Sequence, residues 1–235
     1  FCRKKKKSRS ASLPRRNPNM LTEKGVHFLA IEGAIGVGKT SLAEIIANRW
    51  KATLIEENFR ENPFLEKFYQ NKEAYALQTQ LFFLLDRLKQ LQNSALQSDL
   101  FRDLLISDYT YDKDQIFAAQ NLTESEYAMY DQVAKALNHD IPRPDLVVYL
   151  QASVPTLLKR IHGRGRTMEK TIEGSYLNGL LERFDNYFWN YPYAPVLIIN
   201  TDHIDFVHNE NHLQLVLDAI AACPKQTTYF VPEGK

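Results

Sequence analysis

The feature that most constrains this chain is a glycine-rich stretch in which Gly33 and Gly38 bracket four residues and Lys39-Thr40 follow, the phosphate-loop pattern. Glycines let backbone N–H groups point at a phosphate without a Cβ clash, and a following helix adds a positive dipole end. Lys39 supplies a charge to the outer phosphates, and Thr40 supplies a hydroxyl ligand for Mg²⁺. A glycine-rich turn that arose by chance is the alternative. The predicted triphosphate site comprises Gly33, Ala34, Ile35, Gly36, Val37, Gly38, Lys39, Thr40 and Ser41.

The segments around this loop predict a strand before it and a helix after it. Residues 26–32 are a short apolar run, and residues 41–50 repeat apolar side chains at helical spacing. Further strands are predicted at 53–56, 104–106, 145–150 and 196–199, and helices at 63–70, 72–93, 113–120, 123–138, from 153 onward, 174–190 and 209–222. This alternation predicts an α/β fold of the phosphate-loop NTPase type, with a parallel sheet of five strands and helices on both faces.

Composition limits the function classes that suit this chain. Its 235 residues, 44% of them hydrophobic, suit one globular domain, and no apolar run approaches the roughly 20 residues of a membrane span. Eight of the 29 Lys and Arg residues lie in residues 1–19, so the remainder carries 21 basic against 28 acidic residues. We therefore expect a small substrate and neither a nucleic-acid nor a membrane partner. Cys2 and Cys223 show no metal or redox spacing, which favours a reducing cytoplasm.

Residues 1–19 differ in character from the rest of the chain. They begin with Phe, are rich in Lys and Arg, contain two prolines and show no apolar periodicity. We expect a disordered tail, a fusion remnant, or translation upstream of a start at Met20. A nucleic-acid-binding or targeting arm is less favoured, because the segment has no apolar signal core. The folded domain is expected to span residues 20–235.

Two further features suit chemistry on a triphosphate. Asp108 follows the strand predicted at 104–106, where an acid beside a phosphate loop is placed to hold Mg²⁺. Arg160, Arg164 and Arg166 lie within seven residues that also contain two glycines. Guanidinium groups match phosphoryl oxygens and glycines let a flap close, so this segment predicts a mobile, arginine-rich lid. A solvated basic loop is the alternative.

Together these features predict phosphoryl transfer, a reaction in which positioning and charge stabilisation carry most of the catalysis. A switch GTPase would carry an Asn-Lys-x-Asp motif, which this sequence lacks, and a motor ATPase usually needs a longer chain. A small-molecule kinase suits the length best.

At this point the sequence resembles one family. Between about residues 26 and 220 it is similar to the deoxynucleoside kinases that act on deoxyadenosine, deoxyguanosine and deoxycytidine. The resemblance is carried by Ile31-Glu32-Gly33 before the phosphate loop, by the run Pro-Asp-Leu-Val-Val-Tyr-Leu-Gln at 144–151 and by the Arg-Gly-Arg of the lid. Tyr69, Gln80 and Arg87 add ungapped spacings of eleven and seven residues.

The resemblance implies roles for residues that would face the acceptor. Glu57, after the second strand, matches the general base that takes the proton of the substrate 5′-hydroxyl. Gln80 matches the amide that reads the edge of the base, because an amide offers both a donor and an acceptor. Arg87 and Asp114 match a polar pair behind the base in members that take purines or cytosine.

The resemblance also implies roles at the sugar and at the phosphates. Tyr69 and Glu169 match residues that hold the sugar 3′-hydroxyl, where room for a 2′-hydroxyl is restricted and deoxyribose is favoured. The cations implied at the transferring phosphate are Lys39, Arg160, Arg164 and Arg166.

Two positions depart from the family pattern. The family usually has Glu-Arg-Ser or Asp-Arg-Ser after the third strand, whereas this chain has Asp108-Tyr109-Thr110. Asp108 keeps the acid, but Tyr109 cannot supply the positive charge of the arginine. Either Lys113 or a lid arginine substitutes for it, or the transition state is held differently. The second departure is Asn58, which stands where a proline commonly follows the base glutamate.

We therefore predict transfer of the γ-phosphate of ATP, or of another nucleoside triphosphate, to the 5′-hydroxyl of a purine deoxynucleoside, with Mg²⁺, in nucleotide salvage. The purine assignment depends on the joint presence of Arg87 and Asp114. One alternative is a nucleoside monophosphate kinase of the thymidylate type, which would need basic residues at the acceptor site. The other is a nucleotide-binding module without catalysis, to which Tyr109 lends some weight.

The helix predicted at 72–93 carries a seam of leucines at alternating steps of four and three residues, Leu77, Leu81, Leu84, Leu88 and Leu91. Such a seam faces another helix and predicts a homodimer through packed helices, as the family commonly forms. A helix buried within one chain is the alternative.

Overall fold

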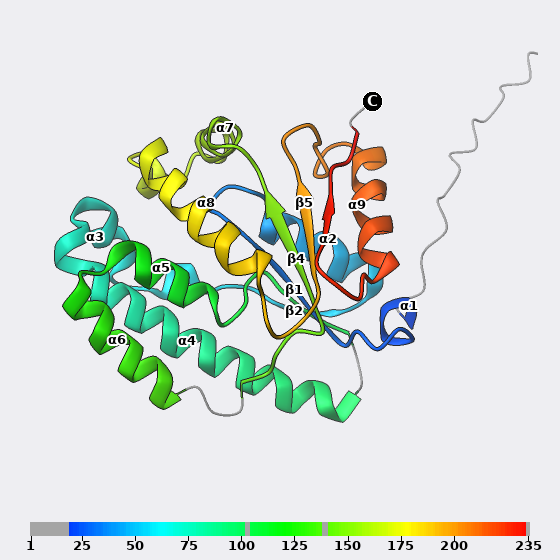
Figure 1. The fold of residues 1–235 in the computed structure, drawn as a ribbon, viewed down its shortest axis with the longest axis horizontal. Helices are drawn as coiled ribbons and strands as arrows, with labels where there is room; N and C mark the ends of the chain where they lie inside the picture. Colours follow the sequence, from blue (N-terminus) through cyan, green and yellow to red (C-terminus); the bar gives the residue numbers. More distant parts are fainter. Residues whose placement is uncertain (1–18, 102–103, 138–140, 234–235) are drawn as a thin grey trace, which may run out of the picture.

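A computed structural model describes residues 19–101, 104–137 and 141–233, and a parallel sheet lies at its centre (Figure 1). In this part of the chain the sheet has six strands in the order β2-β3-β1-β4-β5-β6, and all of its neighbours pair in parallel. The strands are β1 (Phe28–Gly33), β2 (Thr53–Ile55), β3 (Leu105–Ser107), β4 (Leu146–Gln151), β5 (Val196–Asn200) and β6 (Thr228–Phe230). The parallel α/β fold is thus confirmed.

The first five strands lie within two residues of their predicted bounds, but the prediction of five strands was wrong by one. The sixth strand, β6, is only three residues long and pairs with β5 at the edge of the sheet. Its Tyr229 side chain is half exposed, so the segment lacks the buried apolar run by which the central strands were predicted. Pairing with β5 decides its conformation.

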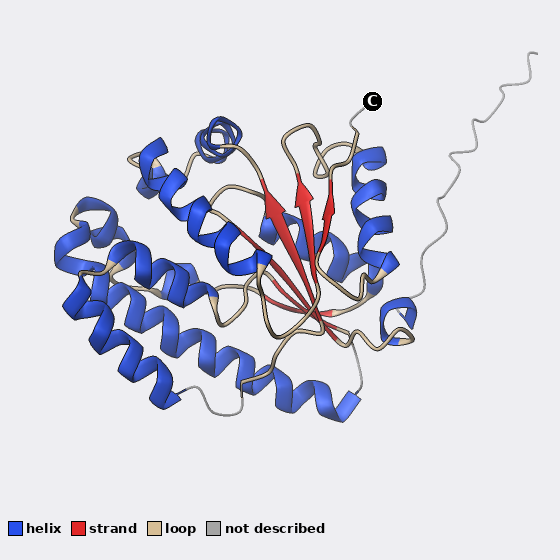
Figure 2. Cartoon of the chain, in the orientation of Figure 1, coloured by secondary structure: helices blue, strands red, loops and turns tan. Residues whose placement is uncertain are grey.

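Helices cover both faces of the sheet, with α4, α5 and α8 on one side and α2 and α9 on the other (Figure 1). Figure 2 shows the strands fanning out between these two layers. The helices are α1 (Asn19–Thr22), α2 (Lys39–Trp50), α3 (Leu65–Gln70), α4 (Lys72–Phe101), α5 (Lys113–Asn121), α6 (Glu124–Leu137), α7 (Val154–Arg164), α8 (Gly174–Trp189) and α9 (Glu210–Ala222). Each predicted helix is present, although position 138, predicted to end α6, lies outside the described residues, as do residues 1–18.

The central strands are apolar on both faces because helices cover both faces. All six residues of β1 are buried, including Glu32, and β4 is buried from Leu146 to Leu150. Asp145 aligns these two strands at their start, since its carboxylate accepts the backbone N–H groups of His27 and Phe28, both at 2.8 Å. The carboxyl ends of β1 and β4 therefore finish side by side, next to the phosphate loop.

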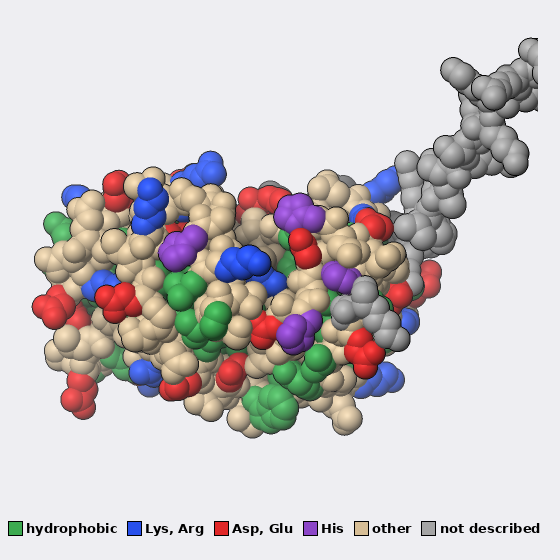
Figure 3. Space-filling model, turned by 90° about the horizontal axis from the view of Figure 1, so that it is seen from above, with side chains coloured by type: hydrophobic (Ala, Val, Ile, Leu, Met, Phe, Trp, Pro, Cys, Tyr) green, Lys and Arg blue, Asp and Glu red, His purple; other side chains and the backbone are tan. Residues whose placement is uncertain are grey.

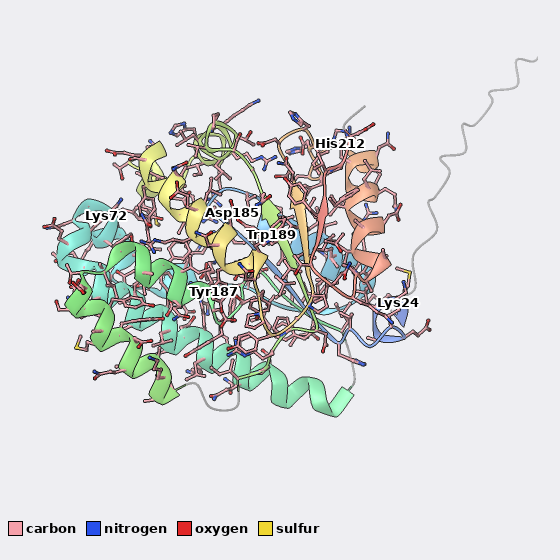
Figure 4. The ribbon with its side chains drawn as sticks, viewed as in Figure 1. Lys24, Lys72, Asp185, Tyr187, Trp189 and His212 are labelled. Carbon is pink, nitrogen blue, oxygen red and sulfur yellow. The ribbon has the colours of Figure 1, made fainter. Side chains whose placement is uncertain are left out.

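Helix α8 is attached to β4 by polar and aromatic contacts. Asp185, labelled in Figure 4, accepts hydrogen bonds from Tyr149 (2.6 Å) and from Gln151 (2.5 Å). The Tyr149 ring stacks on Phe184 and Phe188 of the same helix. These contacts fix the orientation of α8 against β4.

The leucine seam of α4 faces the core of its own chain. Leu84 and Leu91 are fully buried, and Leu77, Leu81 and Leu88 pack against the same core. Helix α4 lies against α3, α5 and α6 of the same chain. The seam thus forms the helix interface within one chain that was the alternative to a dimer contact.

Candidate active site

The phosphate loop connects β1 to α2, as its sequence predicts, and its glycines are sterically required. Gly33 has φ +144°, and a Cβ there would lie 2.4 Å from the carbonyl oxygen of Leu150. Gly38 has φ +107°, and its Cβ would lie 2.8 Å from the Phe206 ring. Any other residue would strain the backbone and collide with its neighbours, so both positions depend on glycine.

Lys39, the first residue of α2, folds its side chain back over the loop. Its Nζ donates to the carbonyl oxygens of Gly33 (2.8 Å) and Ala34 (3.0 Å). Burial and the charge of Lys113 together lower the pKa of Lys39 to about 8, against the opposing effect of nearby carboxylates. A partly buried ammonium group at the phosphate loop suits a triphosphate.

Thr40 and Asp108 meet beside the loop, as expected for a pair of magnesium ligands. The Thr40 hydroxyl donates to Asp108, whose second carboxylate oxygen accepts the backbone N–H of Glu57 at 2.9 Å. In the described ranges, no group of three or more His, Cys, Asp or Glu side chains converges to bind a metal by itself. Mg²⁺ favours one or two protein oxygens together with water and substrate phosphates, so Thr40 and Asp108 fit the ion.

Glu57 lies just beyond the end of β2 and contacts two cations. Its Oε1 accepts from Arg87 of α4, with Nε at 3.0 Å and a second, shorter bond from the same guanidinium. Its Oε2 accepts from Lys113 Nζ at 2.7 Å. Burial alone would raise the pKa of Glu57, but the charges of Lys113 and Arg87 outweigh burial and hold the pKa below its usual range. Glu57 is therefore a carboxylate at neutral pH.

Arg87 connects Glu57 to a second buried acid, Asp114. Its Nη1 lies 2.5 Å from Asp114 Oδ1, and Tyr130 donates to the other carboxylate oxygen at 2.9 Å. Burial raises the pKa of Asp114 to about 6, while the charge of Arg87 opposes that rise. Asp114 lies behind Arg87 and orients its guanidinium group, and it does not line the cavity beside the phosphate loop.

The raised pKa of Asp114 predicts a pH-dependent contribution to stability. Because the folded chain binds this proton more tightly than the unfolded chain, the contribution is complete below about pH 4 and is lost as pH rises through about 6. The difference in unfolding free energy between wild type and Asp114→Asn should fall by about 2–3 kcal/mol between pH 4 and pH 7. Urea unfolding of both proteins measures this, and a pH-independent difference would contradict it.

A cavity of about 110 Å³ opens beside the phosphate loop, and most of the predicted site residues line it. The predicted residues that line it are Ile35, Gly36, Lys39, Thr40, Glu57, Tyr69, Gln80, Arg87, Asp108, Arg164, Arg166 and Glu169. Its apolar wall, which the sequence analysis missed, includes Phe59, Leu65, Phe68, Phe83, Phe117 and Tyr176. Of these six residues, only Phe83 could have been predicted from the sequence, because it lies between the predicted site residues Gln80 and Arg87 on one helix.

Much of the predicted lid is helical, and its mobility stays a prediction. Helix α7 continues through Arg164 and ends at Gly165, which caps it in the left-handed conformation at φ +72°. Arg164 and Arg166 line the cavity and contact Glu169, at 2.5 and 3.3 Å. Figure 3, which looks onto the carboxyl ends of the strands, shows basic side chains near the middle of this face.

Arg160, the third predicted lid cation, lies apart from the cavity lining. Its guanidinium donates to the Thr201 hydroxyl (2.9 Å), to the Thr201 carbonyl (2.7 Å) and to the Val37 carbonyl (3.2 Å). These bonds attach α7 to the phosphate loop and to the segment after β5. A role for Arg160 at the phosphates stays a prediction.

Tyr109 points away from the cavity. Its side chain is fully buried, and its hydroxyl donates to Gln90 at 2.6 Å. Lys113, one turn further along the chain and only 4% exposed, supplies a cation to Glu57 in addition to Arg87. Of the two predicted substitutes for the family arginine at position 109, Lys113 contacts the Glu57 carboxylate. The lid residues Arg164 and Arg166 contact Glu169 instead.

The sheet, the phosphate loop and the paired acids and cations define a phosphate-loop phosphotransferase. The sequence model of the deoxynucleoside kinase family matches residues 29–223, and the chain belongs to that family. It is 36% identical to the deoxyguanosine kinase of Bacillus subtilis over 193 residues, which cover 80% of this chain and 93% of that protein. It is 30% identical to the deoxyadenosine kinase of Lactobacillus acidophilus, over 83% and 95% of the two chains. The chain is therefore an enzyme of the deoxynucleoside kinase class.

Solved structures agree with the fold. The deoxyadenosine kinase of M. mycoides, solved with bound dATP, superposes with a TM-score of 0.70 at 24% identity, over 83% of this chain and 98% of the other. The same protein with dCMP and dCDP bound gives the same TM-score. At this identity the likeness supports the fold alone.

Proposed function

We propose that this enzyme transfers the γ-phosphate of ATP, with Mg²⁺, to the 5′-hydroxyl of a purine deoxynucleoside. The observation that carries the proposal is Gln80. Its side chain is 3% exposed and lines the cavity, yet its amide has no hydrogen-bond partner among the described residues. The amide atoms reach the cavity, where one group that can both donate and accept a hydrogen bond matches the edge of a nucleobase.

Arg87 supports a purine in this position. It lies seven residues, or about two helical turns, after Gln80 on α4, and Asp114 holds it from behind. The ring of Phe83, 4.9 Å from the Arg87 guanidinium carbon, and the ring of Phe117 offer flat apolar surfaces for a base. Relatives named as deoxyguanosine and deoxyadenosine kinases support this choice, and one further relative is named as a deoxyadenosine/deoxycytidine kinase.

The reaction follows from the residues around the loop. Glu57 accepts the proton of the 5′-hydroxyl as the 5′-oxygen bonds to the γ-phosphorus, and the bond from that phosphorus to the β-bridging oxygen breaks to release ADP. Thr40 and Asp108 would hold Mg²⁺, which neutralises phosphate charge when bound. Lys39, Arg164 and Arg166, which line the cavity, are proposed to contact the same phosphates. Tyr69 and Glu169 are proposed to hold the 3′-hydroxyl, from the cavity wall they share with Tyr176.

A phosphorylation assay across the four deoxynucleosides with Mg-ATP tests the proposal. We expect deoxyguanosine or deoxyadenosine to be the preferred acceptor, and we expect EDTA to abolish turnover. Thymidine as the sole good acceptor would contradict the purine assignment, and turnover of none would contradict the kinase. Deoxynucleoside monophosphates are the matched control, because a monophosphate kinase would prefer them.

The cellular setting of the enzyme stays a prediction. Nucleotide salvage, a cytoplasmic location and a homodimer accord with the proposed reaction, although the dimer no longer rests on the leucine seam of α4. None of the helices in the described ranges combines the length and the apolar character that a membrane crossing needs.

A further inference from the structure

We propose that Lys113 is a further catalytic residue, whose ammonium group holds Glu57 in the free enzyme and moves to the transferring phosphoryl group when both substrates are bound. This inference rests on the proposed function and deepens it, because it assigns a cation to the position where charge develops in the transition state.

Lys113 has unused hydrogen-bonding capacity directed at the cavity. Its side chain is 4% exposed and lines the cavity, and its Nζ lies 2.7 Å from Glu57 Oε2. An ammonium group has three N–H donors, and among the described residues only Glu57 accepts one. Two donors of a buried cation are therefore left for a ligand, and phosphoryl oxygens are the acceptors expected in this cavity.

The main chain around Lys113 is held firmly to the end of β1. Buried Glu32, the residue before the phosphate loop, accepts from the Thr110 backbone N–H at 2.6 Å and from the Thr110 hydroxyl at 2.9 Å. The Lys113 N–H donates in turn to the Thr110 carbonyl at 3.3 Å. Glu32 thereby positions the turn from which the lysine projects, so that only its side chain needs to move.

Electrostatics direct that movement toward the phosphate loop once a triphosphate is bound, because without an anion the charge of Lys39 repels Lys113. The charge of Lys113 acts on the Lys39 ammonium, so two like charges share one side of the cavity until an anion binds. Arg87 is less free than Lys113, since it bonds both Glu57 and Asp114. A triphosphate therefore attracts Lys113 away from Glu57, and the released oxygen becomes available for the 5′-hydroxyl proton.

Steady-state kinetics of Lys113→Met and Lys113→Arg test the inference. We expect Lys113→Met to lower kcat about 10²–10³-fold, as removal of one charge-stabilising donor does, with the KM for the nucleoside changed less than about threefold. Lys113→Arg keeps the charge, so its kcat should be at least about tenfold higher than that of Lys113→Met. Lys135→Met is the matched control, because it removes the same charge from an exposed side chain of α6.

A binding measurement separates direct action on the phosphoryl group from action through Glu57. Mg-ADP with aluminium fluoride and the nucleoside imitates the transferring phosphoryl group, and calorimetry measures how tightly the enzyme binds it. In the Glu57→Gln background, adding Lys113→Met should weaken this binding about tenfold, the value of one charge-assisted hydrogen bond. An unchanged affinity in the Glu57→Gln background would overturn the inference. A kcat of Lys113→Met within about threefold of an active wild type would also overturn it, and both outcomes leave the proposed function intact. A wild type that phosphorylates no deoxynucleoside would instead overturn the proposed function. Melting temperatures confirm that each variant is folded.

Discussion

Glu57→Gln should lower kcat about 10²–10⁴-fold while the affinity for the nucleoside changes only a few-fold, because removal of a general base affects the chemical step and not ground-state binding. The glutamine amide oxygen can still accept from either Arg87 or Lys113, whereas its NH₂ group faces the other cation, so a melting temperature checks that the variant is folded. Initial rates with Mg-ATP and calorimetric titration with the nucleoside measure the two effects separately.

The adjacent residue Glu56 provides the control for this prediction. It is exposed, does not line the cavity and precedes Glu57 directly in the chain. Glu56→Gln should therefore retain wild-type kinetics. Near-normal turnover of Glu57→Gln would remove Glu57 as the base and would require another proton acceptor beside the phosphate loop.

Arg87→Met should destabilise the folded enzyme by about 3–5 kcal/mol, the range observed when one partner of a buried ion pair is removed. The Arg87 side chain is 3% exposed and bridges Glu57 to Asp114. Its loss leaves the Asp114 carboxylate with only the Tyr130 hydroxyl among the side chains that the structure describes. For a chain of this length the melting temperature should fall by roughly 10 °C or more. The loss should be smaller at pH 5 than at pH 8, because Asp114, with its pKa raised to about 6, is then mostly neutral.

Gln80→Met is the matched control on the same face of α4. Gln80 is equally buried but has no partner among the described protein groups, so its replacement should change the melting temperature little. It should instead weaken nucleoside binding, because the base loses its hydrogen-bonding partner. Equal melting temperatures for Arg87→Met and wild type would show that the Glu57–Arg87–Asp114 cluster does not stabilise the fold.

The sequence alone determined the features that depend on local geometry. The phosphate loop is one, because Gly33 and Gly38 need backbone angles that other residues rarely adopt, and the strand and helix beside it follow from apolar spacing. Gln80 and Arg87 are another, because a separation of seven residues places two side chains on one face of a helix. Parallel strands likewise bring acids at their carboxyl ends together, which is why Asp108 and Glu57 lie beside the loop.

Only the tertiary structure decided which distant charges meet. Lys113 lies 56 residues from Glu57 in the chain, and no spacing rule relates them; the anchoring of Thr110 by Glu32 brings them within 2.7 Å. The same holds for Tyr109, which turns toward Gln90, and for Arg160, which bonds backbone carbonyls after β5. Strand β6 forms through pairing with β5 rather than through its own pattern. Such contacts depend on burial and on the packing of elements far apart in sequence, and these arise only when the chain is folded.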